Sequence, residues 1–348
     1  MISSYLTSIA RCPACIASGN GTKRNLEPES DGLRCPKCAR RFPALAERGY
    51  LDLRPPEGTF DDLTEYAEEE FHHREGALRP LFLSARVKAD VMRGMLDPKP
   101  SDRILDIGCG NGRFVYFQRD ASAELVGIDA GAHFAEEPLA SVALARGDIR
   151  VLPFADASFD KAYSLDVLEH LTEDGVVRML SEARRVLKPG GSLFLYSHVM
   201  MSSRLASFQR GVNRLVRWLD ARGLVDNAPE RERKSDHRNA LRSYEQLDAI
   251  LSKTGYRIET IRYYNVFFKA ILEDLMLPLV EHNFFPKKAK EEEPSGAPAH
   301  GHSHGSSKPD VGRWAHGPLT LASYLMKLDV ALFGRVRTGP FFLLLRAI

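Results

Sequence analysis

Short apolar runs recur between residues 103 and 197, and each is followed by a segment that separates it from the next run. Near-continuous apolar runs of this kind are typical of strands that are buried on both faces of a parallel sheet. The runs lie at 103–107, 124–129, 145–149, 158–166 and 192–197. Strands that alternate with helices predict an α/β fold with a doubly wound, Rossmann-like sheet.

The carboxyl-terminal part continues this pattern and adds two helical insertions, at about 200–235 and 266–335. Further expected elements are strands at 256–264 and 339–346 and helices at 238–251 and 319–333. In the first insertion, apolar residues recur at alternating spacings of three and four, which predicts an amphipathic helix. These residues are Leu205, Phe208, Val212, Leu215 and Leu219.

The second insertion combines a wide apolar face with a polar, low-complexity tract. Apolar residues dominate 267–280, but the acids at 273, 274 and 281 argue against a membrane span. The tract at 287–309 has too few apolar residues to form a core, and we expect it to be a disordered loop. Its three alternating histidines, at 300, 302 and 304, receive no assigned role.

Composition is that of an ordinary globular protein and narrows the classes of partner. Of the 348 residues, 44% are hydrophobic and 27% are charged, which argues against disordered, collagen-like and membrane-spanning chains. A formal net charge of +2 gives no overall field that would attract nucleic acid or an anionic membrane, so any basic patch must be local. Residues 1–10 lack the cationic start of a secretory signal, and we expect a cytoplasmic protein with reduced thiols.

Four of the five cysteines form two C-x2-C pairs near the amino terminus: Cys12, Cys15, Cys35 and Cys38. The 19 residues between the pairs fit the spacing of a structural zinc ribbon. Two such turns that face each other give the closed tetrahedral thiolate site that Zn²⁺ prefers, with no position for a catalytic water. Two disulfides in an exported protein are the alternative. We predict a zinc ribbon over residues 1–56 and a larger domain over 57–348.

The ribbon sequence resembles a small family of zinc-ribbon proteins that activate tRNA and protein methyltransferases. The resemblance rests on residues 33–43, which read LRCPKCARRFP, and on residues 49–55, which read GYLDLRP. In this chain the ribbon is fused to a much larger segment.

A glycine-rich turn follows the run at 103–107 and leads into a helix-compatible stretch. Gly108, Gly110 and Gly112 leave room for a ligand to approach the backbone, and the next helix start offers unpaired N–H groups. The second run ends at Asp129, 17 residues after Gly112, where a carboxylate is well placed to accept two ribose hydroxyls. Together these residues predict a nucleotide-type cofactor site.

These features together resemble the class I S-adenosylmethionine-dependent methyltransferase family, over about residues 84–264. The matching segments are the glycine loop, Asp129, the Gly147-Asp148 step, the Leu168-Glu169-His170-Leu171 segment and the Lys188-Pro189-Gly190-Gly191 turn. The resemblance implies a seven-stranded methyltransferase sheet and S-adenosylmethionine as the cofactor.

The same resemblance implies roles for individual residues at the cofactor site. Asp106 helps to hold the amino-acid end of the cofactor, Gly108 and Gly110 face it, Asp129 takes the ribose, Asp148 and Ile149 border the adenine, Asp166 borders the methionine end, and Asn111 and Ala130 complete the set.

Each of these acids also has a structural alternative. Asp106 can cap the loop, Asp129 can cap the next helix, and Asp148 can lie in a turn. A dinucleotide dehydrogenase is the alternative for the whole loop, but Arg113 occupies the place of the third glycine in that fingerprint. The thiol of Cys109 lies between two glycines and is expected to be a buried packing group.

Methyl transfer from a sulfonium requires an acceptor that is held in line with the methyl group while water is excluded. If the acceptor is a hydroxyl or a protonated amine, a general base with a pKa near neutrality helps, and His170 is the candidate. The alternative is a structural role for His170 at a helix start. His198 and His237 are further candidates for the base.

We therefore expect a methyltransferase that acts on an amphipathic small molecule, such as a quinone, a lipid or a glycan intermediate. One alternative is an RNA base methyltransferase, in which ribbon cations position phosphates. These cations are Arg24, Arg34, Lys37, Arg40 and Arg41. Another alternative is a non-catalytic scaffold that keeps the fold and binds a protein partner. The basic amphipathic helix at 204–222 is typical of helices that contact anionic lipids or phosphate backbones, so peripheral contact with a membrane is one expectation. The alternative is a helix that caps the active site and keeps its arginines solvated on the outside.

Overall fold

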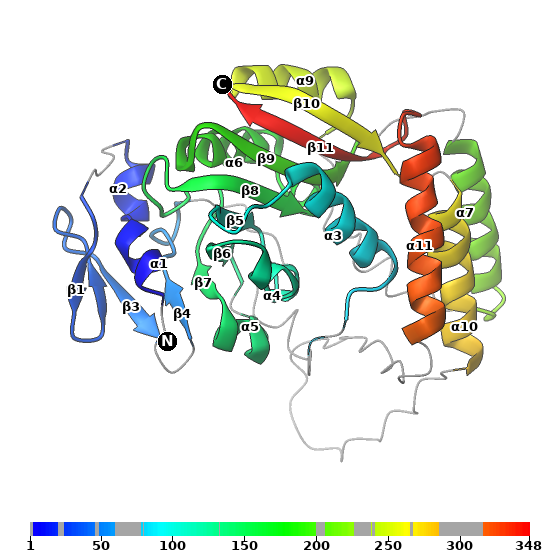
Figure 1. Ribbon diagram of the computed structural model, residues 1–348, viewed down its shortest axis with the longest axis horizontal. Coiled ribbons are helices and arrows are strands. Elements are labelled where there is room, and N and C mark those ends of the chain that lie inside the picture. The colour runs from blue at the N-terminus through cyan, green and yellow to red at the C-terminus, as the bar shows by residue number, and fades with distance from the viewer. Residues whose placement is uncertain are drawn as a thin grey trace, which may run out of the picture.

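The computed structural model describes eleven stretches of the chain (Figure 1). These are residues 3–19, 24–45, 49–59, 78, 80–131, 133–199, 206–225, 238, 241–264, 267–284 and 316–348. The expected disordered loop at 287–309, its three histidines, His237 and Leu205 lie outside the described residues.

A twisted sheet forms the centre of the molecule, in the strand order β7-β6-β5-β8-β9-β11-β10. Its strands are β5 (Arg103–Ile107), β6 (Glu124–Asp129), β7 (Ala143–Arg146), β8 (Phe159–Leu165), β9 (Leu187–His198), β10 (Tyr256–Tyr263) and β11 (Pro340–Ala347). The first five are parallel to one another, and β11 inserts antiparallel between β9 and β10. The predicted doubly wound α/β fold with seven strands is confirmed.

The strand residues are apolar because the sheet is covered on both faces. Its helices are α3 (Leu83–Leu96), α4 (Arg113–Gln118), α5 (Glu136–Ser141), α6 (Glu173–Val186) and α9 (Tyr244–Lys253), with 3-10 turns η3 (Arg119–Ala121) and η4 (Leu168–His170). Buried residues of α6 and α9 join one hydrophobic cluster, and buried residues of α3 and α4 join a second. In β5, for example, Leu105 and Ile107 belong to the first cluster and Ile104 to the second.

The amino-terminal ribbon continues this sheet. Its elements are α1 (Ser4–Ile9), α2 (Pro13–Ala17), β1 (Glu27–Glu29), β2 (Gly32–Arg34), β3 (Arg41–Leu45) and β4 (Tyr50–Asp52). Strands β1 to β4 pair antiparallel in sequence, and β4 then pairs parallel with β7 through Leu51 and Ala145. The ribbon residues Leu33 and Phe42 lie in the same hydrophobic cluster as the sheet. The boundary between 1–56 and 57–348 stays a prediction.

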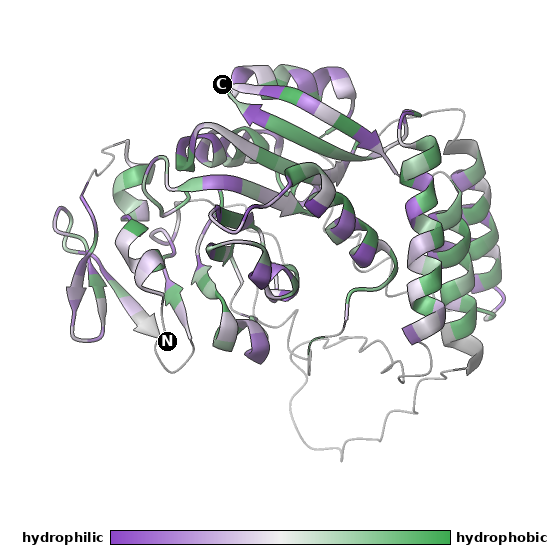
Figure 2. Ribbon diagram, in the orientation of Figure 1, coloured by the Kyte–Doolittle hydropathy of each residue, from purple (hydrophilic) through white to green (hydrophobic). Residues whose placement is uncertain are grey.

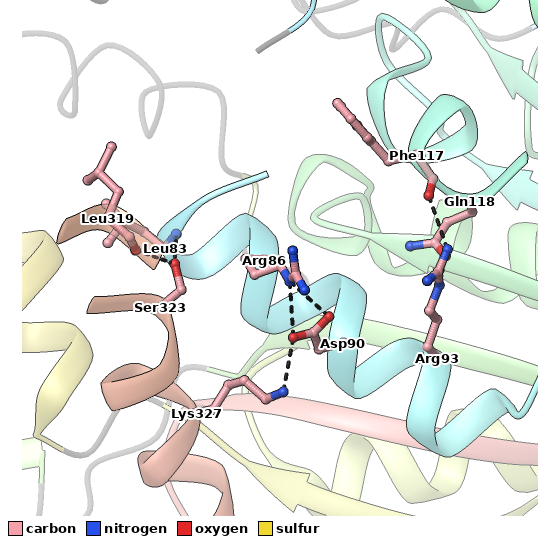
Figure 3. Close-up of polar contacts among 9 residues, drawn as sticks. All are labelled: Leu83, Arg86, Asp90, Arg93, Phe117, Gln118, Leu319, Ser323 and Lys327. Atoms are coloured by element: carbon pink, nitrogen blue, oxygen red, sulfur yellow. Dashed lines mark hydrogen bonds and ion pairs between the residues drawn. The ribbon is translucent and has the colours of Figure 1, made fainter. Parts of the chain in front are cut away.

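The insertions form a helical unit beside the sheet. Its members are α7 (Ala206–Asp220), a π-helix η5 (Ala270–Met276), α10 (Leu277–Phe284) and α11 (His316–Phe333), and Figure 1 shows α7, α10 and α11 side by side. Helix α11 packs on α3, where Ser323 accepts a hydrogen bond from the Leu83 N–H at 2.7 Å and Lys327 pairs with Asp90 at 2.9 Å (Figure 3). In the described residues, no helix is long and apolar enough to cross a membrane.

Two local expectations were wrong. The helix expected over 238–251 begins at Tyr244, because Ser243 caps it by accepting a hydrogen bond from the Gln246 N–H. In α7, the expected apolar stripe is shifted: Val212 and Val216 are buried against Ala270, whereas Leu215 is exposed. Residues at spacings of three and four cover a broad arc, and the position of η5 decides which part of that arc is buried.

Candidate functional site

The glycine loop between β5 and α4 has a backbone that only glycine adopts without strain. Gly108 and Gly112 have φ angles of +79° and +85°. A Cβ at Gly108 would meet Val167 at 2.4 Å, and one at Gly112 would meet Pro138 at 2.7 Å. Gly110 differs, since a Cβ there would meet nothing within 4 Å. The loop is therefore packed from behind at two glycines and open at the third.

Asp129, at the end of β6, holds the loop in place. Its two carboxylate oxygens accept hydrogen bonds from the Gly110 N–H at 2.8 Å and from the Gly131 N–H at 2.9 Å. Asp129 therefore connects the open part of the loop to the end of β6, and its role toward a ribose stays a prediction.

Asp106, in β5 directly before the loop, is a buried carboxyl group with an unfulfilled acceptor. Its side chain is 2% exposed, and among the described residues its Oδ2 has no hydrogen-bond partner. Burial raises the pKa of Asp106 well above its ordinary value. A buried polar atom without a partner is costly in a folded protein, and a ligand donor is one way to satisfy it.

Four other predicted cofactor residues lie at this edge of the sheet, and three of them form hydrogen bonds within the protein. Asn111 Oδ1 accepts from the Arg113 N–H at 3.1 Å, at the start of α4, and the Ala130 carbonyl accepts from Arg146 Nε at 3.0 Å. Asp148 forms a buried two-point pair with Arg150, at 3.0 and 2.7 Å. Ile149, between the two, is half-buried. The turn predicted as the structural alternative for Asp148 is therefore present.

Asp166 follows β8 and pairs with a cation that sequence analysis did not identify. The residue has φ +57°, in the left-handed region, and its carboxylate pairs with Lys88 of α3. The Lys88 ammonium also lies 4.4 Å from the ring centre of Tyr196. Lys88 belongs to no motif, because its place depends on how α3 packs across the sheet.

A buried acid, Glu169, lies beside His170 in η4. Its Oε2 accepts a hydrogen bond from the Ser197 hydroxyl at 2.8 Å, and its Oε1 lies 4.0 Å from His198 Nδ1. Burial raises the pKa of Glu169 to about 7, and the nearby Asp166 carboxylate adds to this shift. His170 is half-buried at the end of η4, and its backbone N–H donates a hydrogen bond to the Val167 carbonyl at 3.0 Å.

These groups all follow the carboxyl ends of neighbouring parallel strands. The glycine loop follows β5, Asp129 ends β6, Asp148 follows β7, Asp166 and Glu169 follow β8, and Ser197 and His198 end β9. Ligands of open α/β sheets bind outside this edge, where the strand order reverses. The order changes direction on either side of β5, so the loop lies at that point.

The four ribbon cysteines converge in the structure, with sulfur atoms within 4.8 Å of one another. The Sγ atoms of Cys12 and Cys38 are 3.6 Å apart, and those of Cys15 and Cys35 are 3.8 Å apart. Zn–S bonds of about 2.3 Å in a tetrahedron imply sulfur separations of about 3.8 Å, whereas a disulfide requires about 2.05 Å. The arrangement fits a Zn²⁺ ion and not the disulfide alternative. Cys109, the fifth cysteine, is buried, as expected.

Known proteins share part of this chain. A family model described as "Methyltransferase domain" matches residues 105–195. The chain is similar to Probable tRNA methyltransferase 9B of Mus musculus, with 34% identity over 130 residues, 35% of this chain and 28% of that protein. It is 36% identical over 124 residues to 27-O-demethylrifamycin SV methyltransferase of Amycolatopsis mediterranei, covering 33% of this chain and 45% of the relative. It spans less than half the length of these relatives.

A solved structure is also similar: phosphoethanolamine N-methyltransferase 2 of Haemonchus contortus in complex with S-adenosyl-L-methionine. The identity is 20%, the TM-score is 0.44, and the match covers 76% of this chain and 52% of that chain. The segment matched by the family model runs from β5 into β9 and includes the glycine loop, Asp129 and Glu169. Residues 105–195 of the chain therefore match a methyltransferase domain.

Proposed function

We propose that the protein is a methyltransferase that binds S-adenosylmethionine at the glycine loop. Two neighbouring features of the loop together carry this proposal. Asp106 Oδ2 is buried without a hydrogen-bond partner among the described residues, and Gly110 has open space where a side chain would be. Asp129 fixes the position of Gly110 through its N–H. Both features suit a ligand that brings hydrogen-bond donors to the carboxyl edge of the sheet. When bound, the cofactor supplies an electrophilic methyl group on a sulfonium.

The residues would divide the cofactor among them as the resemblance implies. Asp106 would receive donors of the amino-acid end, with Gly108, Gly110 and Asn111 beside it. Asp129 and Ala130 would lie at the ribose, Asp148 and Ile149 at the adenine, and Asp166 at the methionine end. Lys88 adds a role that the sequence did not predict, since its ammonium at Asp166 can hold the cofactor's carboxylate.

For proton removal from the acceptor, we propose His198 together with Glu169 in place of His170. A carboxyl group near an imidazole can orient the ring and stabilise the imidazolium that forms when the ring takes a proton. Glu169 is fixed by Ser197 and lies 4.0 Å from His198 Nδ1, and the His198 side chain is 31% exposed. The remaining task of the chain is to align the acceptor and exclude water.

The acceptor that this proposal favours is an amphipathic small molecule. Exposed apolar side chains lie on α11, which packs against α3 with its Lys88, and on α7 and η5, which pack against each other. The named rifamycin relative acts on a small molecule. The RNA alternative is favoured by the named tRNA relative, but two of the ribbon cations, Arg34 and Arg41, already pair with Glu29 at 3.8 and 3.1 Å.

The same proposal includes a structural Zn²⁺ in the cysteine cluster and peripheral membrane contact through the 204–222 helix. A closed thiolate site leaves no open position for catalysis, so the ion would stabilise the ribbon. A cytoplasmic location and the scaffold alternative stay predictions.

Calorimetric titration of the purified protein with S-adenosylhomocysteine tests the proposal without knowledge of the acceptor. We expect micromolar binding, and Asp129→Ala should weaken it by on the order of 1–3 kcal/mol, because charged hydrogen bonds to the loop and ribose are lost. Asp120→Ala, an exposed acid in η3, is the matched control and should bind normally. Unchanged affinity in Asp129→Ala would refute the site, and no binding by folded, zinc-loaded protein would favour the scaffold.

A further inference from the structure

Helix α11 packs one face on α3, and among the described residues its opposite face is apolar and uncovered. The outer residues recur at spacings of four, three and four, as Leu321, Leu325, Leu328 and Leu332, with Tyr324 beside them. Leu321 and Leu332 are 62% and 65% exposed. An exposed apolar stripe along a whole helix is uncommon in soluble monomers and marks a contact surface.

Both charged residues of α11 have partners within the protein. Lys327 pairs with Asp90 of α3 at 2.9 Å (Figure 3), and its ammonium also lies 5.6 Å from the ring centre of Tyr324. The fully buried Asp329 accepts hydrogen bonds from the N–H groups that begin the π-helical turn, those of Phe267, Phe268 and Lys269. From Leu321 to Leu332, α11 has no other acidic or basic side chain.

Helix α7 presents exposed apolar residues next to a row of arginines. Phe208, Leu215 and Trp218 are exposed, with Trp218 at 48%. On a helical projection at 100° per residue, they lie between the buried Val212–Val216 side and the exposed Arg210, Arg214 and Arg217. An apolar face with tryptophan and flanking arginines is typical of helices that lie in the membrane interface.

The two helices belong to one packed unit. The ring of Phe267 packs against the rings of Phe208 of α7 and Phe333 of α11. The ring centres are 5.0 Å and 5.3 Å apart, respectively. Between them, η5 and α10 add the exposed residues Ile271, Met276 and Val280. Figure 2 shows hydrophobic colour along much of α7, α10 and α11, which Figure 1 labels in the same orientation. We call the exposed apolar residues of α7, η5, α10 and α11 the helical platform.

We propose that the helical platform docks the protein on the surface of a bilayer that contains anionic lipids. The row of arginines on α7 favours an anionic bilayer as the partner of this surface. Helix α7 contains a single acid, Asp220, and the acids of η5 already have partners, since Glu273 accepts from Ser84 and Asp274 pairs with Lys269 at 2.7 Å. A second copy would therefore bring arginines together with few acids to meet them, whereas lipid phosphates supply the opposite charge.

Docking in this way would place the candidate site near the membrane surface. Helix α11 packs along α3, and α3 carries Lys88, which pairs with Asp166. A lipid-soluble acceptor could then reach the sheet edge without crossing bulk water. This inference rests on the membrane contact named in the proposed function and deepens it. Cofactor binding does not require docking, so a failure of lipid binding and a failure of S-adenosylhomocysteine binding can be told apart.

Vesicle co-sedimentation with the full-length protein tests the inference. We expect pelleting with phosphatidylcholine vesicles that contain 30% phosphatidylglycerol, about tenfold less pelleting with phosphatidylcholine alone, and release as salt is raised. The variant Arg210→Gln/Arg214→Gln/Arg217→Gln should lose most of the difference in pelleting between vesicles with and without phosphatidylglycerol. The variant Leu321→Gln/Leu332→Gln should lose most of its binding to vesicles of either composition. Arg178→Gln, at an exposed position on α6, is the control.

Binding of S-adenosylhomocysteine by each variant shows that it has folded and separates docking from the cofactor site. Equal pelleting by wild type and both platform variants would overturn the proposal, as would absence of pelleting by folded wild-type protein. A dimer in light scattering that Leu321→Gln/Leu332→Gln converts to monomer, without lipid binding by wild type, would assign the platform to a second copy instead.

Discussion

Single residues at the sheet edge carry several tasks at once. Asp129 orders the loop through both Gly110 and Gly131, and Lys88 neutralises Asp166 while its ammonium lies over an aromatic ring. Sequence reasoning found Asp129 because its distance from the glycines is regular. It could not find Lys88, whose relevance depends on a helix that crosses the sheet.

The role of Lys88 predicts a selective loss of affinity. Lys88→Met should weaken binding of S-adenosylhomocysteine by about 1.5–3 kcal/mol, the usual range for a hydrogen bond to a charged group. Binding of 5′-methylthioadenosine, which lacks the amino-acid end, should change little. Calorimetry with both ligands makes the comparison, and Lys99→Met is the exposed control. An equal loss for both ligands would instead indicate a structural role for Lys88.

Glu169 predicts a pH dependence of stability. Its pKa is raised from 4.5 to about 7 in the folded protein, so the folded state holds a proton that the unfolded state has lost between these values. The free energy of unfolding should therefore fall as pH rises from about 4.5 to about 7, by at most about 3 kcal/mol from this group.

Glu169→Gln should remove this part of the dependence while keeping an acceptor for Ser197. Urea unfolding of both proteins at pH 5 and pH 8 measures it, and the variant should gain stability relative to wild type at pH 8. Parallel pH profiles for the two proteins would contradict the assignment.

At the scale of elements, periodicity predicted the strands and helices but not the orientation of every helix. The glycines, the two C-x2-C turns and most apolar runs define local geometry and were observed where expected. The run expected at 145–149 is the exception, because its strand, β7, covers Ala143–Arg146 and the residues after it form a turn. The apolar spacing in α7 correctly predicted a helix but not which residues are buried. Val216 faces η5, and Leu215 is exposed. The π-helical turn at 270–276 has no signal in the apolar pattern.

The cysteine cluster predicts that the ribbon depends on its metal. Cys35→Ser should abolish binding of the proposed Zn²⁺ and lower the melting temperature, because Cys35 is fully buried and the ribbon has little core of its own. Cys109→Ala, which changes a cysteine outside the cluster, should keep one metal per chain. Elemental analysis and thermal unfolding provide the measurements; full metal content with a native melt in Cys35→Ser would rule out this site.

At the scale of the whole molecule, the ribbon, sheet and helical platform form a continuous structure. The sheet extends through β4 into the ribbon, and Arg11 and Ile9 of the amino terminus bond to Pro153 and Ala155. The sequence suggested a small module followed by a larger domain. Only the tertiary structure revealed that the module supplies an additional parallel strand.

Removal of residues 1–56 should therefore destabilise the remaining protein rather than leave it intact. It strips the fully buried Leu51 and Leu53 from the sheet and exposes the edge of β7. With losses of about 2–5 kcal/mol per buried leucine, we expect at least about 4 kcal/mol, and poor solubility. Denaturant unfolding of the truncated chain measures this, and a soluble fragment with wild-type stability would show that the ribbon is an independent unit.

The sequence by itself determined what depends on neighbours along the chain. The positions of most parallel strands along the chain, the glycine loop, Asp129 and the cysteine pairs all follow from spacing, because backbone conformation and short-range geometry are encoded locally. The tertiary structure decided what depends on distant segments: the pairing of Lys88 with Asp166, the position of Glu169 between Ser197 and His198, and the exposed face of α11. Burial, and with it pKa and exposure, is a property of the whole packed chain.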